Sequence, residues 1–537
     1  MNDAVVRLLI IGVYLLCLVA LGLVSARFGR ATNRDYLLAS HSIGPILLLL
    51  SIFGTTMTAF AMLGSTGEAF SRGIVIYGLM ASASGILHSF CIYTVGVRLW
   101  NWGRRHGFTT QIQFLRARLD SVAFGYVLFP VLVLLIIPYL LIGVIGSGVA
   151  IETMTAGAFP GWSIFHHENP LLDGAVPRWL GSLVACVVVL TYVFFGGMRG
   201  TAWANGLQTL LFMALGVVTF IMVARGIGGD GSLWQSMINA SRDAKSELMV
   251  RGSFSRLEFL SYLLIPLSLG MFPHLVQHWL TARSAAAFRL PIVCHPLFIL
   301  IVWAPCVFMG VWASGLSLPA SVSSDPNAVL PYLVQQYATP LAAGLLTAGL
   351  LAAIMSSLDS QFLCLGTMFT HDLFLPLVGE QRFSEKRQVW IARSFIVFIV
   401  AVTYVLSLQG FRSVFAMGIW SFTGFAGLFP VMMAALYWRR LTAAGALAGV
   451  LTMVGAWVFL FSQSEWGNNR KFAIEFWIGE HIERMNPVVV TVFATTLSMV
   501  VTSLLTRPPR AECLARFFPS ATPASGTQAA TSANSEG

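Results

Sequence analysis

The sequence predicts an all-α polytopic membrane protein with about 13 transmembrane helices. Of its 537 residues, 57% are apolar and only 10% are charged, whereas an ordinary soluble chain has roughly 25% charged residues. Segments of about 20 apolar residues, enough to cross a bilayer core of roughly 30 Å, recur along the chain. Two of these segments carry small or helix-breaking residues near their middle, which predicts helices that break within the membrane.

The predicted spans follow one another with mostly short polar loops between them. The first is longer than the apolar region of a signal peptide, so we interpret it as a retained helix. The spans are 4–26, 43–63, 74–99, 122–149, 179–196, 204–224, 257–281, 292–316, 339–371, 388–409, 411–438, 442–462 and 487–506.

Basic residues between the spans predict the orientation. With the N-terminus outside, the loops after odd-numbered spans are cytoplasmic, and they hold most of the basic residues, such as Arg104, Arg105, Arg439 and Arg440. The positive-inside rule is then satisfied. We expect a multi-pass protein of the plasma membrane, or of the inner membrane in a bacterium, with its C-terminus in the cytoplasm. The net charge of +10 follows from this topology and does not indicate a nucleic-acid partner.

The segments between spans divide the chain further. The external stretches 225–256 and 463–486 mix aromatic and charged residues, which is typical of short surface helices. After Arg507 the composition turns to Pro, Ala, Ser and Thr, which favours disorder. We predict an accessory helix and cytoplasmic loop (1–42), a first core repeat (43–225), an extracellular loop (226–256), a second core repeat (257–438), two accessory helices with an extracellular loop (439–506) and a disordered cytoplasmic tail (507–537).

Spans 43–63 and 257–281 form a matched pair of interrupted helices. The first contains the stretch GTTMT at 54–58, and the second contains PLSLGMFP at 266–273. The two lie five spans apart and cross the membrane in opposite directions, as the broken helices of inverted repeats do. Such residues also occur in ordinary membrane helices, where neighbouring groups satisfy the freed backbone. Their matched placement favours two inverted five-helix repeats.

Span 339–371 has a polar centre. Ser356, Ser357, Ser360 and Asp359 lie near the middle of a long apolar stretch. The hydroxyls are consistent with close helix packing and equally with oxygen ligands for a hard cation. A charge at bilayer depth is costly and usually faces a cavity or a partner, so Asp359 is a site candidate.

Five stretches of the chain carry a family resemblance. They are DYLLASHSIG (35–44), LGSTGEAF (63–70), TYVFFGGMRGTAWANGLQ (191–208), PHLVQHWLTARS (273–284) and GLLAAIMSSLDSQ (349–361). Together they resemble the sodium/solute symporter family, which includes sodium/proline, pantothenate and monocarboxylate symporters. The likeness implies a leucine-transporter-like fold, in which the second to eleventh spans form a five-plus-five inverted repeat.

The resemblance also implies a sodium site between the broken second span and the ninth. Carried over by position, the carbonyls of Gly54, Met57 and Ala353 and the hydroxyls of Ser356 and Ser357 hold the ion. Sodium is the metal expected, as a co-transported ion, and no cofactor is implied.

A solute pocket follows from the same fold. Half-helix amide ends and Thr hydroxyls suit a small carboxylate or amino acid. Asp359 is a possible coupling residue that tunes the sodium site, binds a proton or only hydrogen-bonds within the bundle. The expected pocket residues are Thr55, Thr56, Thr58, Phe60, Phe272, Trp420 and Phe422.

Four departures from the family pattern bear on specificity. Asn205 stands where many members have Asp, which weakens the case for a second sodium site. Thr56 replaces an Asp of proline-transporting members, and Ile265 and Leu269 replace their aromatic residues, so proline is a weaker candidate. His278 stands where the family usually has Arg.

The prediction is therefore a sodium-coupled symporter that imports a small organic solute by alternating access. A proton-coupled carrier of the same fold and a transporter-like membrane sensor are the alternatives. An enzyme is not expected, because the sequence shows no nucleophile, base and metal set at bilayer depth. The expected partners are the solute, sodium and the lipid bilayer, with no nucleic acid and no obligatory protein partner.

Overall fold

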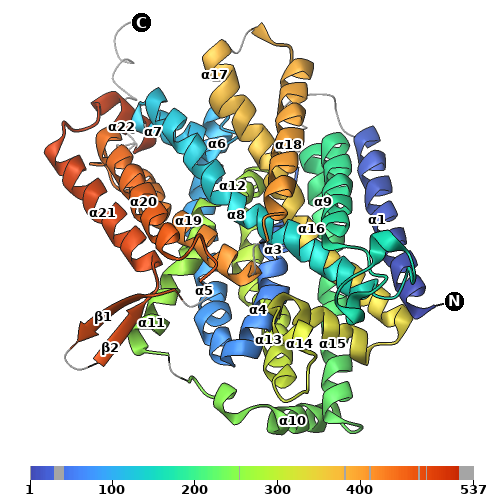
Figure 1. Cartoon of the computed structure of the whole chain (residues 1–537). Helices are drawn as coiled ribbons and strands as arrows, with labels where there is room; N and C mark the ends of the chain where they lie inside the picture. The colour runs from blue at the N-terminus through green and yellow to red at the C-terminus, as the bar shows by residue number, and fades with distance from the viewer. Residues whose placement is uncertain are drawn as a thin grey trace, which may run out of the picture.

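The computed structural model describes residues 2–28, 42–252, 254–379, 382–410, 413–469, 472–478 and 481–518. Within these residues, ten helices are long and apolar enough to cross a membrane, and two bent pairs raise the number to twelve when each pair is one span. Figure 1 shows these helices side by side in one bundle. The predicted all-α polytopic membrane fold is confirmed.

One of the ten helices accounts for two predicted spans. Helix α9 (Arg178–Gly228) is broken at Gly197, whose φ of 54° and ψ of −157° are not helical. Tyr192 donates a hydrogen bond to Asp359, and Asn205 donates one to the adjacent Ser360. In a straight helix those two donors would be about 20 Å apart. The chain therefore turns back at Gly197, and spans 179–196 and 204–224 are separate crossings.

The first half of the core begins with a broken helix. Pro45 occupies the first turn of α3, where its missing N–H costs nothing. The elements are α3 (Pro45–Thr56), η2 (Phe60–Gly64), α4 (Ser65–Arg72), η3 (Tyr77–Ser82), α5 (Ala83–Cys91), η4 (Ile92–Gly96), α6 (Val97–His106), α7 (Gln111–Leu119), α8 (Val122–Met154), η5 (Ser163–Phe165), η6 (Pro170–Leu172) and α9.

The second half has the matching break and the long helix that carries the serines. It comprises α11 (Arg256–Ser261), η8 (Tyr262–Met271), α12 (Pro273–Leu280), η9 (Ala285–Phe288), α13 (Arg289–Ala313), α14 (Ala320–Ser323), η10 (Pro326–Ala328), α15 (Val329–Tyr337), α16 (Pro340–Met368), η11 (Phe369–Phe374), α17 (Leu375–Val378), α18 (Glu385–Ser407) and α19 (Val414–Tyr437). Helix α16 is buried along nearly its whole length, so it is a central element of the bundle.

The remaining elements surround this core. One of the two predicted surface helices is present, but the segment 463–486 contains a β-hairpin, so the prediction of a helix there is wrong. Ile474 and Phe476 alternate with the exposed Glu475 and Trp477, which is the period of a strand. The elements are α1 (Asp3–Phe28), α10 (Leu233–Asp243), η7 (Ser246–Leu248), α20 (Ala443–Gln463), β1 (Ile474–Ile478), β2 (His481–Met485) and α21 (Val488–Leu505).

The beginning of the predicted tail is ordered, which corrects its start at 507. Helix α22 (Ala511–Phe517) follows α21. Phe517 is buried against Trp102, His106 and Phe114, and this apolar contact fixes the helix on α6 and α7. The rest of the predicted tail, 519–537, and the loop 29–41 lie outside the described residues.

Candidate functional site

The first break separates α3 from α4. Helix α3 ends where Met57 takes an extended backbone conformation (φ −83°, ψ 117°). The Thr58 hydroxyl then accepts a hydrogen bond from the Phe60 N–H at 3.0 Å and starts the next helical segment. The two halves of the span meet at 57°. The backbone at residues 54–58 is therefore partly released from helical hydrogen bonding at the middle of the bundle.

The second break has the same form. The 3₁₀-helical η8 ends at Phe272, whose backbone is extended (φ −64°, ψ 116°), and Pro273 begins α12. The two halves meet at 50°. Both interrupted spans of the sequence are thus bent at the positions that their Gly, Pro and Thr residues predict.

Two serines of α16 point at the first break. The Ser356 hydroxyl donates to the Gly54 carbonyl at 2.8 Å and to the Ala353 carbonyl at 2.9 Å. The Ser357 hydroxyl donates to the Thr55 carbonyl at 3.1 Å. Four of the five predicted sodium ligands therefore lie together, and Met57 follows at the residue where α3 ends.

Close helix packing makes this arrangement specific. A Cβ added at Gly54 would meet the Thr209 hydroxyl of α9, and that hydroxyl itself donates to the Leu50 carbonyl at 2.8 Å. Glycine at position 54 lets α3 approach α9 and α16 closely. Its carbonyl is consequently held at a fixed place beside Ser356.

Asp359 belongs to a neighbouring hydrogen-bond network that joins α16 to α9. Its carboxylate accepts from the Tyr192 hydroxyl at 3.0 Å and from the Ser360 hydroxyl at 2.9 Å. Asn205 donates to the Ser360 oxygen at 2.9 Å. The side chain is fully buried, and these donors give its oxygens the hydrogen-bond partners that buried polar atoms need in an apolar bundle.

His278 extends the same network to α3. Its Nε2 lies 3.0 Å from the Ser360 hydroxyl and its Nδ1 lies 2.7 Å from the Ser51 hydroxyl. The ring therefore connects α12 to both α16 and α3. The sequence drew attention to His278 as a departure from the family pattern, but it gave no sign of these two serine partners.

The predicted pocket residues on the first broken span lie at two places. The Thr55 hydroxyl is buried and has no hydrogen-bond partner among the described residues, whereas Thr56 donates back to the Ile52 carbonyl at 2.7 Å. Phe60 stacks on Phe415 with ring centres 4.9 Å apart. It also meets Phe422 edge-on at 4.9 Å. Phe60 thus joins the broken span to α19.

Phe272 and Phe422 belong to one aromatic cluster on the other side of the break. Their ring centres lie 5.6 Å apart. Tyr139 of α8 contacts both rings, at 5.3 Å and 5.1 Å, and its hydroxyl lies near Ser357. His274 stacks on Phe272 at 5.2 Å, and both of its ring nitrogens are buried without a hydrogen-bond partner among the described residues.

Trp420 does not lie with these residues, which corrects its place in the predicted pocket. Its ring packs against Phe461 of α20 at 5.1 Å and against Phe472 at 5.8 Å. Two helical positions correspond to about 200°, so Trp420 and Phe422 project from nearly opposite faces of α19. Trp420 instead joins α19 to the segment before the hairpin.

Sequence reasoning missed Tyr139, which links the serines to the aromatic cluster. A signal was present, because a tyrosine within the apolar run LLIIPYLLIG of 134–143 needs a hydrogen-bond partner for its hydroxyl when buried. The sequence did not show which residue of a distant helix lies near the Tyr139 hydroxyl.

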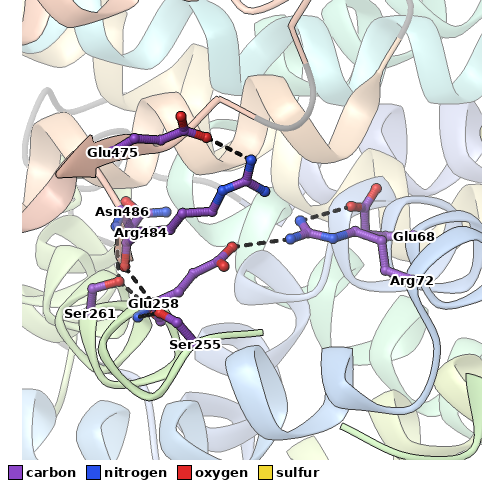
Figure 2. A network of polar contacts seen from close by, with 8 residues as sticks. All are labelled: Glu68, Arg72, Ser255, Glu258, Ser261, Glu475, Arg484 and Asn486. Carbon is purple, nitrogen blue, oxygen red and sulfur yellow. Dashed lines mark hydrogen bonds and ion pairs between the residues drawn. The ribbon is translucent and has the colours of Figure 1, made fainter. Parts of the chain in front are cut away.

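A second polar network, named the outer network because it lies at the ends of the two broken spans and not at their middle, joins α4 to α11 (Figure 2). The Arg72 guanidinium contacts the carboxylates of Glu68 and Glu258, each at 3.2 Å. Both carboxylates are buried, with Glu68 5% and Glu258 6% exposed. Arg72 therefore ties α4 to α11 by a buried ion pair.

The family assignment rests on a match across the middle of the chain. A model of the sodium:solute symporter family matches residues 177–453, slightly more than half of the sequence. The chain belongs to the sodium:solute symporter family. The match includes the second break, the serines of α16 and the network around Asp359.

Relatives with known activities extend the family match to nearly the full length. The chain is 23% identical to the sodium/proline symporter of Escherichia coli over 94% of both chains. It is also 23% identical to that of Staphylococcus aureus over 83% of both chains. These members are transporters, so the chain is a multi-pass membrane transporter and not an enzyme.

Solved structures support the same fold. The structure of a Na⁺-coupled sialic acid symporter in a substrate-bound outward-open state matches 95% of this chain with a TM-score of 0.73 and 15% identity. A nucleobase-cation-symport-1 family transporter in a closed conformation matches 90% of it with a TM-score of 0.53 and 12% identity. The leucine-transporter-like architecture expected from the sequence is confirmed, and the family membership supports sodium-coupled transport.

Proposed function

We propose that this family member is a secondary active symporter that uses the sodium gradient to import a small carboxylate or amino acid by alternating access. The observation that carries the proposal is the contact of Ser356 and Ser357 with the carbonyls of the broken helix α3. Hydroxyl and carbonyl oxygens are the ligands that hard cations prefer in proteins.

The proposed sodium site uses oxygens of the first break and of α16, and the Gly54 and Ala353 carbonyls already lie within hydrogen-bond distance of the Ser356 hydroxyl. Gly54, Met57 and Ala353 supply carbonyls, and Ser356 and Ser357 supply hydroxyls. A sodium ion would replace the hydroxyl proton of Ser356 as the positive partner of the Gly54 and Ala353 carbonyls. Because every ligand is neutral, the site would gain one positive charge on binding, and the membrane potential would drive its occupation from outside.

Coupling follows from the position of this site between two core helices. An ion held by both α3 and α16 favours the arrangement in which oxygens of both helices can contact it at once. If that arrangement also binds solute more tightly, reciprocity requires solute to raise sodium affinity by the same factor, typically through about 1–3 kcal/mol. In this proposal Asp359 positions α16 through its bond to Tyr192 and so supports the adjacent serines.

The proposed solute site lies between the broken span and the aromatic cluster. Thr55 and His274 carry buried polar atoms without partners among the described residues, and buried polar groups normally have one. A small solute with a carboxylate or amino group matches these atoms, while Phe272, Phe422 and Tyr139 match its carbon skeleton.

The relatives that transport proline make this solute an obvious comparison. Thr56, Ile265 and Leu269 nevertheless differ from the residues expected in proline-transporting members, so we place proline behind other small carboxylates and amino acids. We also propose the orientation with the N-terminus outside, because Arg104, Arg105 and the other basic loop residues then face the cytoplasm.

Uptake into liposomes tests the proposal. Purified wild-type protein and the double variant Ser356→Ala/Ser357→Ala are compared with sodium or choline outside, across a panel of labelled carboxylates and amino acids that includes proline. We expect sodium-dependent uptake of at least one solute by the wild type and its loss in the double variant. Uptake that ignores sodium and follows a pH gradient would instead establish a proton-coupled carrier.

A further inference from the structure

A groove on the side of the bundle lies between η11 and the start of α18, beyond the end of the helix that carries the serines. Its volume is about 570 Å³. It is mostly apolar, with one cation and one hydroxyl among its lining residues. Phe369, Phe383, Arg387, Trp390, Ile391, Ser394 and Phe395 line it.

The walls of the groove are aromatic, and they reach from the packed side of α18 to its exposed side. Phe369 and Phe395 stack with ring centres 4.1 Å apart and planes inclined by only 2°. Trp390 is 58% exposed and Phe398, about two turns further along α18, is 59% exposed. Because α18 is a membrane-spanning helix, these apolar surfaces face lipid.

Positive charge gathers at the end of the groove where α18 begins. Arg387 lines the groove, and Arg382 and Lys386 are exposed close to it in the chain. Residues 380–387 hold these three cations and two acidic residues, Glu380 and Glu385. The N-terminus of α18 adds partial positive charge, since its N-cap residue Ser384 makes no side-chain capping bond.

We propose that this groove binds one anionic phospholipid. An acyl chain would lie along Phe369, Trp390 and Phe395, and the phosphate would contact Arg387 and Lys386. A soluble anion would use the charges but not the apolar walls, and a neutral lipid would use the walls but not the charges. Figure 1 places the start of α18 at the same end of the bundle as α7 and α22, where basic loop residues gather.

The position of the groove connects the lipid to the transport machinery. Element η11 is a π-helical continuation of α16, the helix that carries Ser356 and Ser357. A lipid held between η11 and α18 would therefore contact the end of the sodium-binding helix. The lipid site itself does not depend on the proposed transport function, since it can be measured by binding alone.

Native mass spectrometry of the purified full chain in detergent tests the proposal. The protein is titrated with phosphatidylglycerol or with phosphatidylcholine, and the affinity for the first bound lipid is measured. We expect the wild type to bind phosphatidylglycerol about tenfold or more tightly than phosphatidylcholine. Lys386→Ala/Arg387→Ala should lower phosphatidylglycerol affinity about fivefold for each cation removed and leave phosphatidylcholine binding unchanged.

Two further variants make the outcome decisive. Arg289→Ala removes an exposed cation from the first turn of another spanning helix, α13, and should bind both lipids like the wild type. Ser394→Trp fills the groove without changing its charge and should weaken the binding of both lipids. Equal wild-type affinity for the two lipids, or unchanged phosphatidylglycerol affinity in both groove variants, would overturn the proposal.

Discussion

The polar centre of the bundle and the network at its outer end are both buried, but they are built from different groups. At the centre, Ser356 and Ser357 donate to backbone carbonyls, so neutral groups make the contacts between α3 and α16. At the outer end, Arg72 stands between Glu68 and Glu258. Contacts between neutral groups can be exchanged for contacts to an ion, whereas removing one member of a buried ion pair leaves a charge without compensation.

In the proposed mechanism, this difference gives the two regions different parts in transport. The centre would change its contacts when sodium binds, and the two broken helices would respond to it. The outer network instead holds α4 and α11 together, so we expect these two half-helices to move as one body. Substitutions in the two regions should therefore affect different measurements.

The largest effect on stability should come from Arg72→Ala. The substitution leaves the buried carboxylates of Glu68 and Glu258 without their shared cation, which should cost about 3–5 kcal/mol. Thermal unfolding of the detergent-solubilised protein measures the loss. The stabilisation that sodium adds should persist, because the serines of α16 are untouched.

Two controls accompany that measurement. Arg251→Ala removes an exposed arginine from the loop before α11 and should leave the unfolding temperature nearly unchanged. Replacing all three network residues together, as Arg72→Met with Glu68→Gln and Glu258→Gln, should recover most of the stability. If Arg72→Ala unfolds like the wild type, the outer network does not hold the two half-helices together.

The next largest effect should come from Ser356→Ala/Ser357→Ala, and it should appear in sodium affinity. Losing two of five proposed ligands should weaken sodium binding at least about 100-fold, which corresponds to about 2.7 kcal/mol. Sodium-induced thermal stabilisation measures this directly. The stability without sodium should fall by only about 1–3 kcal/mol, the cost of a buried acceptor left without a donor. Equal sodium responses of variant and wild type would place the ion elsewhere.

Sequence reasoning reached the fold because its signals are local. Apolar length marks each span, and the Gly, Pro and Thr residues of 54–58 and 266–273 mark both breaks. The serines of α16 were identified for the same reason, since hydroxyls in an apolar run are conspicuous. The reversal within α9 was predicted too, since Gly197 directly follows span 179–196 and precedes span 204–224.

Contacts between helices that are distant in the chain could not be predicted from the sequence. Trp420 and Phe422 are both aromatic residues of one helix, and only the rotation of α19 about its axis decides which of them faces Phe60. Tyr139 and His278 gain their roles from partners more than 80 residues away in the chain. The sequence showed the chemical type of each side chain, but the packing of the helices decides which side chain each one contacts.

Tyr139→Phe should produce a smaller effect that links the centre to the solute site. The ring contacts with Phe272 and Phe422 remain, and only the hydroxyl beside Ser357 is removed. We expect the solute concentration for half-maximal uptake to rise about fivefold, as for the loss of one hydrogen bond of about 1 kcal/mol. Tyr404→Phe, which removes an exposed hydroxyl on α18, is the matched control. A wild-type uptake curve for Tyr139→Phe would exclude the hydroxyl from the link.

The smallest effect should come from Arg484→Ala in the hairpin, although Figure 2 shows this residue beside the outer network. Arg484 pairs with Glu475 at 2.6 Å, but both side chains are about half exposed, at 48% and 51%, and such pairs contribute at most about 1 kcal/mol. The hairpin is joined to α11 through the Arg484 carbonyl and the Asn486 N–H, which the substitution leaves in place. Thermal unfolding within about 1 °C of the wild type is expected. A loss comparable to that of Arg72→Ala would show instead that the hairpin is held by its charges and belongs to the outer network.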